Sequence, residues 1–318
     1  MSCVDVHFHI IPPFYPAAAA AAGRRPSTSS GTLPPWSPEL ALAVMDDNGI
    51  ATAITSMSSP GVHFGDDVAA RELARRCNEF ARDLRTQWPT RFGNFAVLPL
   101  PDVAGACTEI EYAFDHLGAD GVLLFANYAG RFLGDPAFDP VMDALNRRSA
   151  VVFVHPAIHP ATAALSLNVP AFVIEFPFDT TRAAVNLIFS GSLDRYPNIR
   201  FILAHAGGTL PYLSWRLSAA PEVDPGRFKG IDAEAIRRHL RNFWYDVALA
   251  ADPHTVALLA DIAGPDHILF GSDWPFAPAS ITARAVRTLE QADTAAHVAL
   301  RRANAQKLFP RGSFARSD

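Results

Sequence analysis

The chain has 318 residues, of which 49% are apolar and 19% are charged, and its formal net charge at pH 7 is −5. This apolar share excludes a disordered chain, and the slight acidity offers no basic surface for nucleic acid. No apolar run approaches the roughly 18 residues of a membrane helix, and no leader sequence is evident. We therefore expect a globular, cytoplasmic protein that binds neither nucleic acid nor membrane.

Short apolar runs alternate along the chain with longer amphipathic stretches, as strands and helices do in a buried parallel sheet. The runs predict eight strands, at residues 3–8, 50–57, 92–98, 121–125, 151–154, 200–204, 243–247 and 268–270. Helices are predicted at residues 37–47, 66–87, 103–116, 137–147, 170–194, 210–219, 253–262 and 281–291. Eight such units favour one (β/α)8 TIM barrel over residues 1–318, and an open doubly wound sheet is the alternative.

A long connection separates the first strand from its helix. Residues 11–35 show no obvious element and include six consecutive alanines followed by Arg24 and Arg25. Such a connection is uncommon inside a compact domain, so it is either a lid or binding loop or a tolerated insertion. Either arginine could pair with a substrate carboxylate if this loop closes. Residues 221–230 are predicted to form a second irregular stretch at the surface, to which we assign no function.

Ligand-forming side chains end four of the predicted strands, where TIM barrels carry their active sites. The first strand ends with His7 and His9, which the two-residue period of a strand places on the same side. His155, His205 and Asp273 follow strands five, six and eight. Each alone is more often a hydrogen-bonded or capping residue, but imidazoles with a carboxylate form the ligand set of Zn²⁺, Mn²⁺ or Fe²⁺. The sequence therefore predicts a catalytic metal site.

Lysine is scarce, since only Lys229 and Lys307 occur among 27 basic residues. Neither lies near a strand end, and the stretch after strand four reads Ala126-Asn127. A carboxylated lysine that bridges two metals and a lysine that forms a Schiff base are therefore both missing from the predicted rim. We expect a single metal ion.

Five motifs resemble those of the amidohydrolase superfamily, within it the metal-dependent decarboxylases typified by aminocarboxymuconate semialdehyde decarboxylase. They are DVHFH at residues 5–9, VHP at 154–156, HAGGTLP at 205–211, GSDWPF at 271–276 and NAQKLF at 304–309. Further stretches look most like the 6-methylsalicylate decarboxylase branch: PPFY at 12–15, SSPGV at 58–62, NY at 127–128 and EFPFDTT at 175–181.

The resemblance implies one divalent metal ion per subunit, Zn²⁺ or Mn²⁺, held by His7, His9, His155 and Asp273. It also implies that His205 lies beside the metal as an acid/base group. Relatives carry an arginine that reaches into the neighbouring subunit's pocket, and the matching position here is Arg216. The active unit is then a homodimer or a dimer-based tetramer.

The resemblance further implies an O₂-independent, non-oxidative decarboxylation of an aromatic hydroxy acid of the 6-methylsalicylate or salicylate type. Protonation of the carboxyl-bearing ring carbon releases CO₂, and either Asp273 or His205 supplies the proton. Substrate contacts are expected from Arg216 and from five further residues: Tyr15, Asn127, Tyr128, Trp274 and Phe276. The alternatives are a metal-dependent hydrolase of a lactone or amide, a hydratase, and a non-catalytic metal-binding protein.

Overall fold

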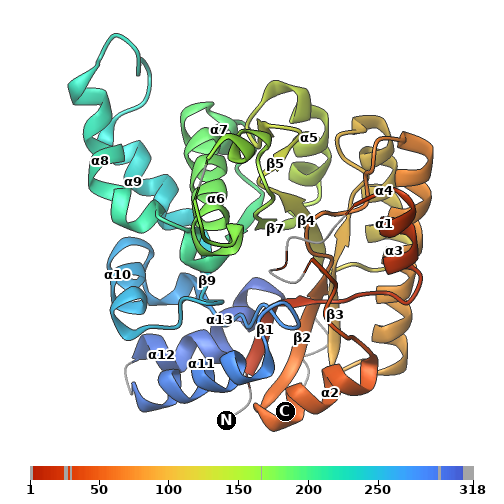
Figure 1. The fold of residues 1–318 in the computed structure, drawn as a ribbon. Helices are drawn as coiled ribbons and strands as arrows, with labels where there is room; N and C mark the ends of the chain where they lie inside the picture. Colours follow the sequence, from red (N-terminus) through yellow and green to blue (C-terminus); the bar gives the residue numbers. More distant parts are fainter. Residues whose placement is uncertain (1–2, 25–27, 29–30, 166, 293–294, 311–318) are drawn as a thin grey trace.

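The computed structural model describes residues 3–24, 28, 31–165, 167–292 and 295–310. Within them, eight parallel strands form a nearly closed barrel surrounded by helices (Figure 1). The strands follow the order of the chain: β1 (Cys3–His9), β2 (Ile50–Ser56), β3 (Phe92–Val97), β4 (Gly121–Phe125), β7 (Val151–His155), β8 (Arg200–Leu203), β9 (Trp244–Asp246) and β10 (Ile268–Leu269). The predicted TIM barrel is confirmed. A short antiparallel ribbon, β5 (Asn127–Tyr128) and β6 (Arg131–Phe132), follows β4.

Thirteen α-helices lie within the described residues: α1 (Tyr15–Ala21), α2 (Pro38–Asp47), α3 (Asp67–Gln87), α4 (Val103–Asp115), α5 (Asp139–Arg147), α6 (Ala171–Phe189), α7 (Ser192–Arg195), α8 (Leu210–Val223), α9 (Ala233–Asn242), α10 (Pro253–Ala263), α11 (Ala279–Gln291), α12 (Ala295–Arg301) and α13 (Ala303–Leu308). Side chains cap several of them, as Asp66 does by accepting a hydrogen bond from the Ala69 backbone at the start of α3. Among these helices, none is both long and apolar enough to cross a lipid bilayer.

The long connection after β1 differs from the prediction because it contains helix α1. Alanine has the highest helix propensity, and Pro16 in the first turn needs no hydrogen-bond partner there, so the alanine run forms a helix. Arg25 lies outside the described residues.

Other boundaries were also predicted wrongly. The helix expected at residues 170–194 is two helices, separated at Gly191, where φ is +73°. Helix α8 continues through Pro221 into the stretch expected to be irregular, and α9, α12 and α13 were not predicted.

The first and last strands meet and close the barrel. The Val6 backbone N–H donates to the Phe270 carbonyl at 3.0 Å, and the His9 N–H donates to the Trp274 carbonyl at 2.7 Å. Bridges between Asp5 and Phe270 and between Phe8 and Trp274 continue this contact. The end of β1 is thereby fixed beside the segment that follows β10.

Aromatic side chains fill the barrel beneath the carboxyl ends of its strands. Phe95 and Phe153 are buried and stack with ring centroids 5.5 Å apart. The ring of Phe153 also lies 4.8 Å from that of His7. The apolar core thus forms the floor of the region described next.

Candidate metal centre

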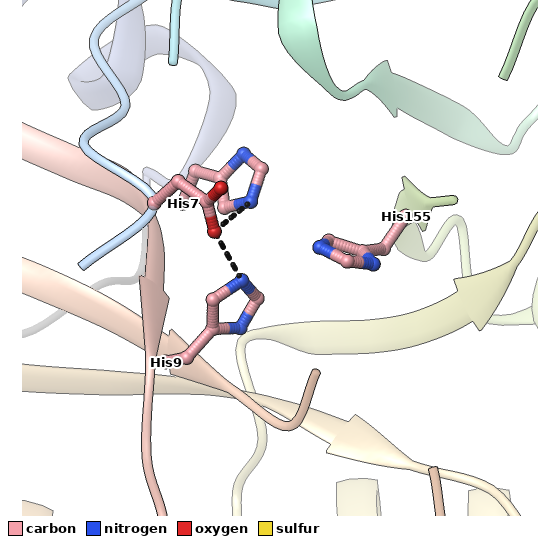
Figure 2. A group of neighbouring side chains, drawn as sticks. His7, His9 and His155 are labelled. Atoms are coloured by element: carbon pink, nitrogen blue, oxygen red, sulfur yellow. Dashed lines mark ion pairs between the residues drawn. The ribbon is translucent and has the colours of Figure 1, made fainter. Parts of the chain in front are cut away.

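Four side chains from three strand ends converge at the carboxyl-terminal mouth of the barrel. One potential ligand atom from each of them lies within 4.8 Å of the others, and the four residues are His7, His9, His155 and Asp273. Figure 2 shows the imidazole rings of His7, His9 and His155 turned toward a common space. Oδ1 of Asp273 lies 3.4 Å from Nε2 of His7 and 3.1 Å from Nε2 of His9. All four residues are buried.

The donor atoms of this group fit a divalent metal ion. Within the described residues, Nε2 of His7 and Nε2 of His9 are buried without a hydrogen-bond partner of acceptable geometry. Leaving such an atom unpaired costs about 1–3 kcal/mol, so buried polar atoms usually have partners. Three imidazoles and one carboxylate are a ligand set that suits Zn²⁺ and Mn²⁺. A metal ion would satisfy these nitrogens.

The local electrostatics favour the ligand forms of His9, His155 and Asp273. Burial, together with the nearby imidazoles His9 and His7, holds the pKa of His155 well below its usual range, and burial also lowers the pKa of His9. Burial alone would raise the pKa of Asp273, but the charge of His7 and the close ring nitrogens of His205, His7 and His9 hold it well below its usual range. Asp273 is therefore an anion beside two neutral imidazoles.

Hydrogen bonds to the opposite ring nitrogen orient two of the imidazoles. Nδ1 of His9 lies 3.0 Å from Oγ of Ser56, and Nδ1 of His155 lies 2.8 Å from the Pro156 carbonyl. An acceptor at Nδ1 keeps the proton there and leaves Nε2 free to bind a metal.

His7 is oriented by a carboxylate that the sequence interpretation missed. Oδ2 of Asp246, on β9, lies 2.9 Å from Nδ1 of His7. Although burial lowers the pKa of His7, the charges of Asp246 and Asp273 raise it to about 10. Strand seven was predicted, but its acidic residue was not singled out; an acidic side chain within a buried apolar strand was the available signal.

His205 lies beside the four residues, as the sequence predicts. It follows β8 and begins the 3₁₀ turn η3 (His205–Gly207). Its Nε2 is 3.5 Å from Oδ2 of Asp273, and its ring centroid is 4.9 Å from that of His7. This separation places Nε2 of His205 close enough to the Asp273 carboxylate for proton exchange between them.

A comparison with models of protein families shows to which family the chain belongs. A model of the amidohydrolase family matches residues 4–311. The chain belongs to this family. The resemblance seen in the motifs is therefore confirmed.

This amidohydrolase is similar to known decarboxylases. It is 40% identical over 318 residues to the 6-methylsalicylic acid decarboxylase of Aspergillus aculeatus, covering 97% of this chain and 96% of that protein. It is 41% identical over 295 residues to the 6-methylsalicylic acid decarboxylase of Penicillium expansum, covering 91% of this chain and 90% of that protein. The dihydroxybenzoic acid decarboxylase of a Polaromonas species, crystallised with manganese and the inhibitor 2-nitroresorcinol, superposes with a TM-score of 0.81 at 26% identity, covering 97% of each chain.

Apolar rings line the amidohydrolase centre. The half-buried ring of Phe276 lies 5.4 Å from that of His9, which agrees with its predicted place at the site. Phe176 lies 6.3 Å from the ring of His155 and was not predicted as a wall residue. With Phe153 below His7, these rings form an apolar surround suited to a flat aromatic molecule.

The side-chain amide of Asn127 forms hydrogen bonds within the protein. Its Nδ2 donates to both carboxylate oxygens of Asp179, at 2.9 and 3.0 Å, and its Oδ1 accepts from the Gly130 N–H at 3.2 Å. The Asp179 carboxylate also accepts from the Ala157 N–H, two residues after His155. Asn127 therefore shapes the loop beside the site, and its contact with a substrate stays a prediction.

Two tyrosines predicted to contact the substrate also form hydrogen bonds within the protein. The Tyr15 hydroxyl donates to the Gly61 carbonyl at 2.7 Å, and the Tyr128 hydroxyl accepts from the Phe125 N–H at 2.9 Å. Both tyrosines are buried. Their contact with a substrate stays a prediction.

Trp274 packs away from the four predicted ligands. Its ring lies 4.8 Å from that of Phe8. Phe8 alternates with His7 and His9 along β1, so its side chain lies on the opposite face of the strand. Trp274 therefore contributes to the wall of the amidohydrolase barrel, and its contact with a substrate stays a prediction.

Arg216 lies on an exposed face of helix α8. It has no ion-pair partner among the described residues, and Tyr212 and Trp215 beside it are 84% and 80% exposed. Positions 212, 215 and 216 share one helical face. Figure 1 shows α8 and α9 standing out from the body of the barrel.

Hydrogen bonds between helix α6 and the turn after β8, here called the Thr181 clasp, hold the loop of His205 in place. Oγ1 of Thr181 accepts from the Thr209 N–H at 2.8 Å and donates to the Pro177 carbonyl at 2.8 Å. Gly208 lies between them with φ of +66°, and a Cβ there would collide with the Pro177 carbonyl oxygen. Only glycine fits this position.

We expect Gly208→Ala to lower the free energy of unfolding by about 2–4 kcal/mol, because it combines an unfavourable positive φ with overpacking. Urea denaturation monitored by circular dichroism measures this loss. Gly23→Ala is the matched control, since Gly23 has φ of +65° and no described heavy atom within 4 Å of an added Cβ. A loss of about 1 kcal/mol is expected there. Equal losses in the two variants would show that the Thr181 clasp imposes no constraint.

Proposed function

We propose that this amidohydrolase is a metal-dependent, non-oxidative decarboxylase of an aromatic hydroxy acid of the salicylate type. The observation that carries the proposal is the group of three histidines and Asp273, with His205 beside it, in a chain 40% identical to a 6-methylsalicylic acid decarboxylase over nearly its whole length. The apolar surround of Phe153, Phe176 and Phe276 suits an aromatic ring.

We assign one divalent ion to His7, His9, His155 and Asp273. The manganese bound to the Polaromonas decarboxylase supports Mn²⁺ over Zn²⁺. The ion would supply a positive charge to which the carboxylate and the adjacent phenol oxygen of the substrate can bind.

The residues of the chain supply the proton. Nε2 of His205 lies 3.5 Å from Oδ2 of Asp273, and we assign to this pair the delivery of a proton to the ring carbon that bears the carboxylate. The bond to the carboxylate carbon then breaks, its electron pair returns to the ring, and CO₂ leaves. Water restores the proton on the enzyme. No electrons leave the substrate, so the reaction needs no O₂.

The test is an anaerobic incubation of the manganese-loaded enzyme with 6-methylsalicylate, salicylate and 2,6-dihydroxybenzoate, with CO₂ and the phenolic product both quantified. We expect equal amounts of the two products, with one deuterium at the former carboxyl position when the reaction runs in D₂O. Enzyme stripped by a chelator is the control. Turnover of a lactone or amide without CO₂ would instead establish the hydrolase alternative.

We also propose that Arg216 acts in the site of a second copy within a homodimer. Its support is the exposed face of α8, where an unpaired guanidinium lies next to the apolar rings of Tyr212 and Trp215. Such rings are typical of interface centres, and a guanidinium binds carboxylates through two parallel hydrogen bonds.

We expect Arg216→Ala and His205→Ala to be nearly inactive alone and to recover activity when the two proteins are mixed and allowed to exchange subunits. In a mixed dimer, the protomer carrying Arg216→Ala keeps its own His205 and receives the partner's arginine. Random exchange therefore restores about a quarter of the wild-type rate per chain. CO₂ release before and after mixing is the measurement. Absence of recovery despite exchange, shown with tagged subunits, would establish that Arg216 serves its own chain.

A further inference from the structure

Asp246 on β9 joins two parts of the site that lie far apart in the sequence, His7 and His205. It is completely buried, and its only ion-pair partner among the described residues is His7. Oδ2 lies 2.9 Å from Nδ1 of His7, while Oδ1 accepts from the His205 N–H at 3.1 Å and from the Ala248 N–H at 2.9 Å. Each oxygen of one carboxylate thus serves a different component of the centre.

The bond to His7 determines which ring nitrogen faces the other ligands. A carboxylate acceptor holds a proton at Nδ1, so the nitrogen of His7 left to bind a metal is Nε2, which faces Asp273 at 3.4 Å. His9 and His155 have only neutral oxygens at Nδ1. His7 alone among the three has a charged acceptor, which makes a stronger hydrogen bond and a more basic ligand nitrogen.

The bond to the His205 backbone holds a strained turn. His205 has φ of +55° and Ala206 has φ of +58°, left-handed conformations that are unfavourable for residues other than glycine. The first N–H of this turn is the one that Asp246 accepts. The orientation of the His205 imidazole toward Asp273 therefore depends on the same carboxylate that orients His7.

We propose that Asp246 is a positioning residue that couples metal binding by His7 to proton transfer by His205. The effect on proton transfer rests on the proposed function. The effect on metal affinity does not, because metal binding requires no particular reaction.

The substitution Asp246→Asn separates the two bonds. Two backbone N–H groups, from His205 and Ala248, require an oxygen at Oδ1, so the new NH₂ group must face Nδ1 of His7. That donor reverses the tautomer of His7 and places its proton on Nε2, while the turn of His205 keeps its acceptor. Asp246→Ala removes both bonds.

The experiment titrates Mn²⁺ into each metal-free protein and follows the free ion by electron paramagnetic resonance. We expect the Kd of Asp246→Asn to rise about 10- to 100-fold over wild type. At saturating Mn²⁺, we expect kcat to fall further in Asp246→Ala than in Asp246→Asn, because only the alanine variant releases the His205 turn. Asp120→Asn is the matched control, since Asp120 is a poorly exposed carboxylate that accepts the Asn94 N–H at the opposite end of the barrel, just before β4.

The control variant should bind Mn²⁺ with the wild-type Kd. The inference is overturned if Asp246→Asn, folded by circular dichroism, binds Mn²⁺ as tightly as Asp120→Asn. If wild type releases CO₂ and the affinities are equal, the inference fails and the proposed function stands. If no tested acid loses CO₂ but the affinity of Asp246→Asn is weakened as expected, the metal-positioning role stands and the proposed reaction fails.

Discussion

Replacing Asp273 with alanine is expected to abolish both stoichiometric metal binding and turnover. Asp273 is the only anion in the ligand group, and its carboxylate lies within 3.5 Å of ring nitrogens of His7, His9 and His205. Its removal leaves three imidazoles without a charged ligand and also takes away the partner with which His205 exchanges a proton. Both losses arise from one side chain because its two oxygens face different groups.

Metal analysis of the purified variant and CO₂ release measure the two effects. Asp266→Ala is a control in the 3₁₀ turn just before β10, where the carboxylate is exposed and pairs with Lys307. A surface pair of this kind contributes at most about 1 kcal/mol, so the control should keep its metal and its rate. An Asp273→Ala protein with a full metal complement and a wild-type rate would disprove the assignment of the site.

Replacing His205 should separate metal binding from catalysis. We expect His205→Ala to retain one metal ion per chain, because His205 lies outside the four-ligand group. We expect its rate of CO₂ release to fall roughly 10²- to 10⁴-fold, the usual contribution of a positioned acid or base.

His205→Asn serves as a second variant, since asparagine tolerates the positive φ of +55° better than alanine does. Agreement between the two variants attributes the loss to the imidazole and not to the backbone. An unchanged rate with bound metal would show that His205 is structural, and loss of the metal would show that it is a ligand.

The strand ends were predictable because local patterns encode them. His7 and His9 follow the two-residue period of β1. His155, His205 and Asp273 each come at the end of a short apolar run, which predicts a buried strand. The convergence of these residues then follows from the geometry of a parallel barrel, whose carboxyl ends share one rim.

Long-range partners were not predictable in the same way. Asp246 belongs to a three-residue strand too short for a clear period, and its hydrogen bond spans 239 positions to His7. Asn127 follows a strand end like the four predicted ligands, yet its amide donates to Asp179, 52 positions away. Sequence patterns predict which rim a side chain reaches, but not which neighbour satisfies its hydrogen bonds.

Barrel closure by β1 and β10 sets the order in which the centre can form during protein synthesis. His7 and His9 leave the ribosome early, and Asp273 leaves late. The Asp273 N–H donates to the His7 carbonyl at 2.8 Å, so the carboxylate reaches the imidazoles only when the last strand docks beside the first. A nascent chain that ends before β10 carries imidazoles without their anionic ligand. The complete ligand group is therefore available only after the last strand has been synthesised and has docked.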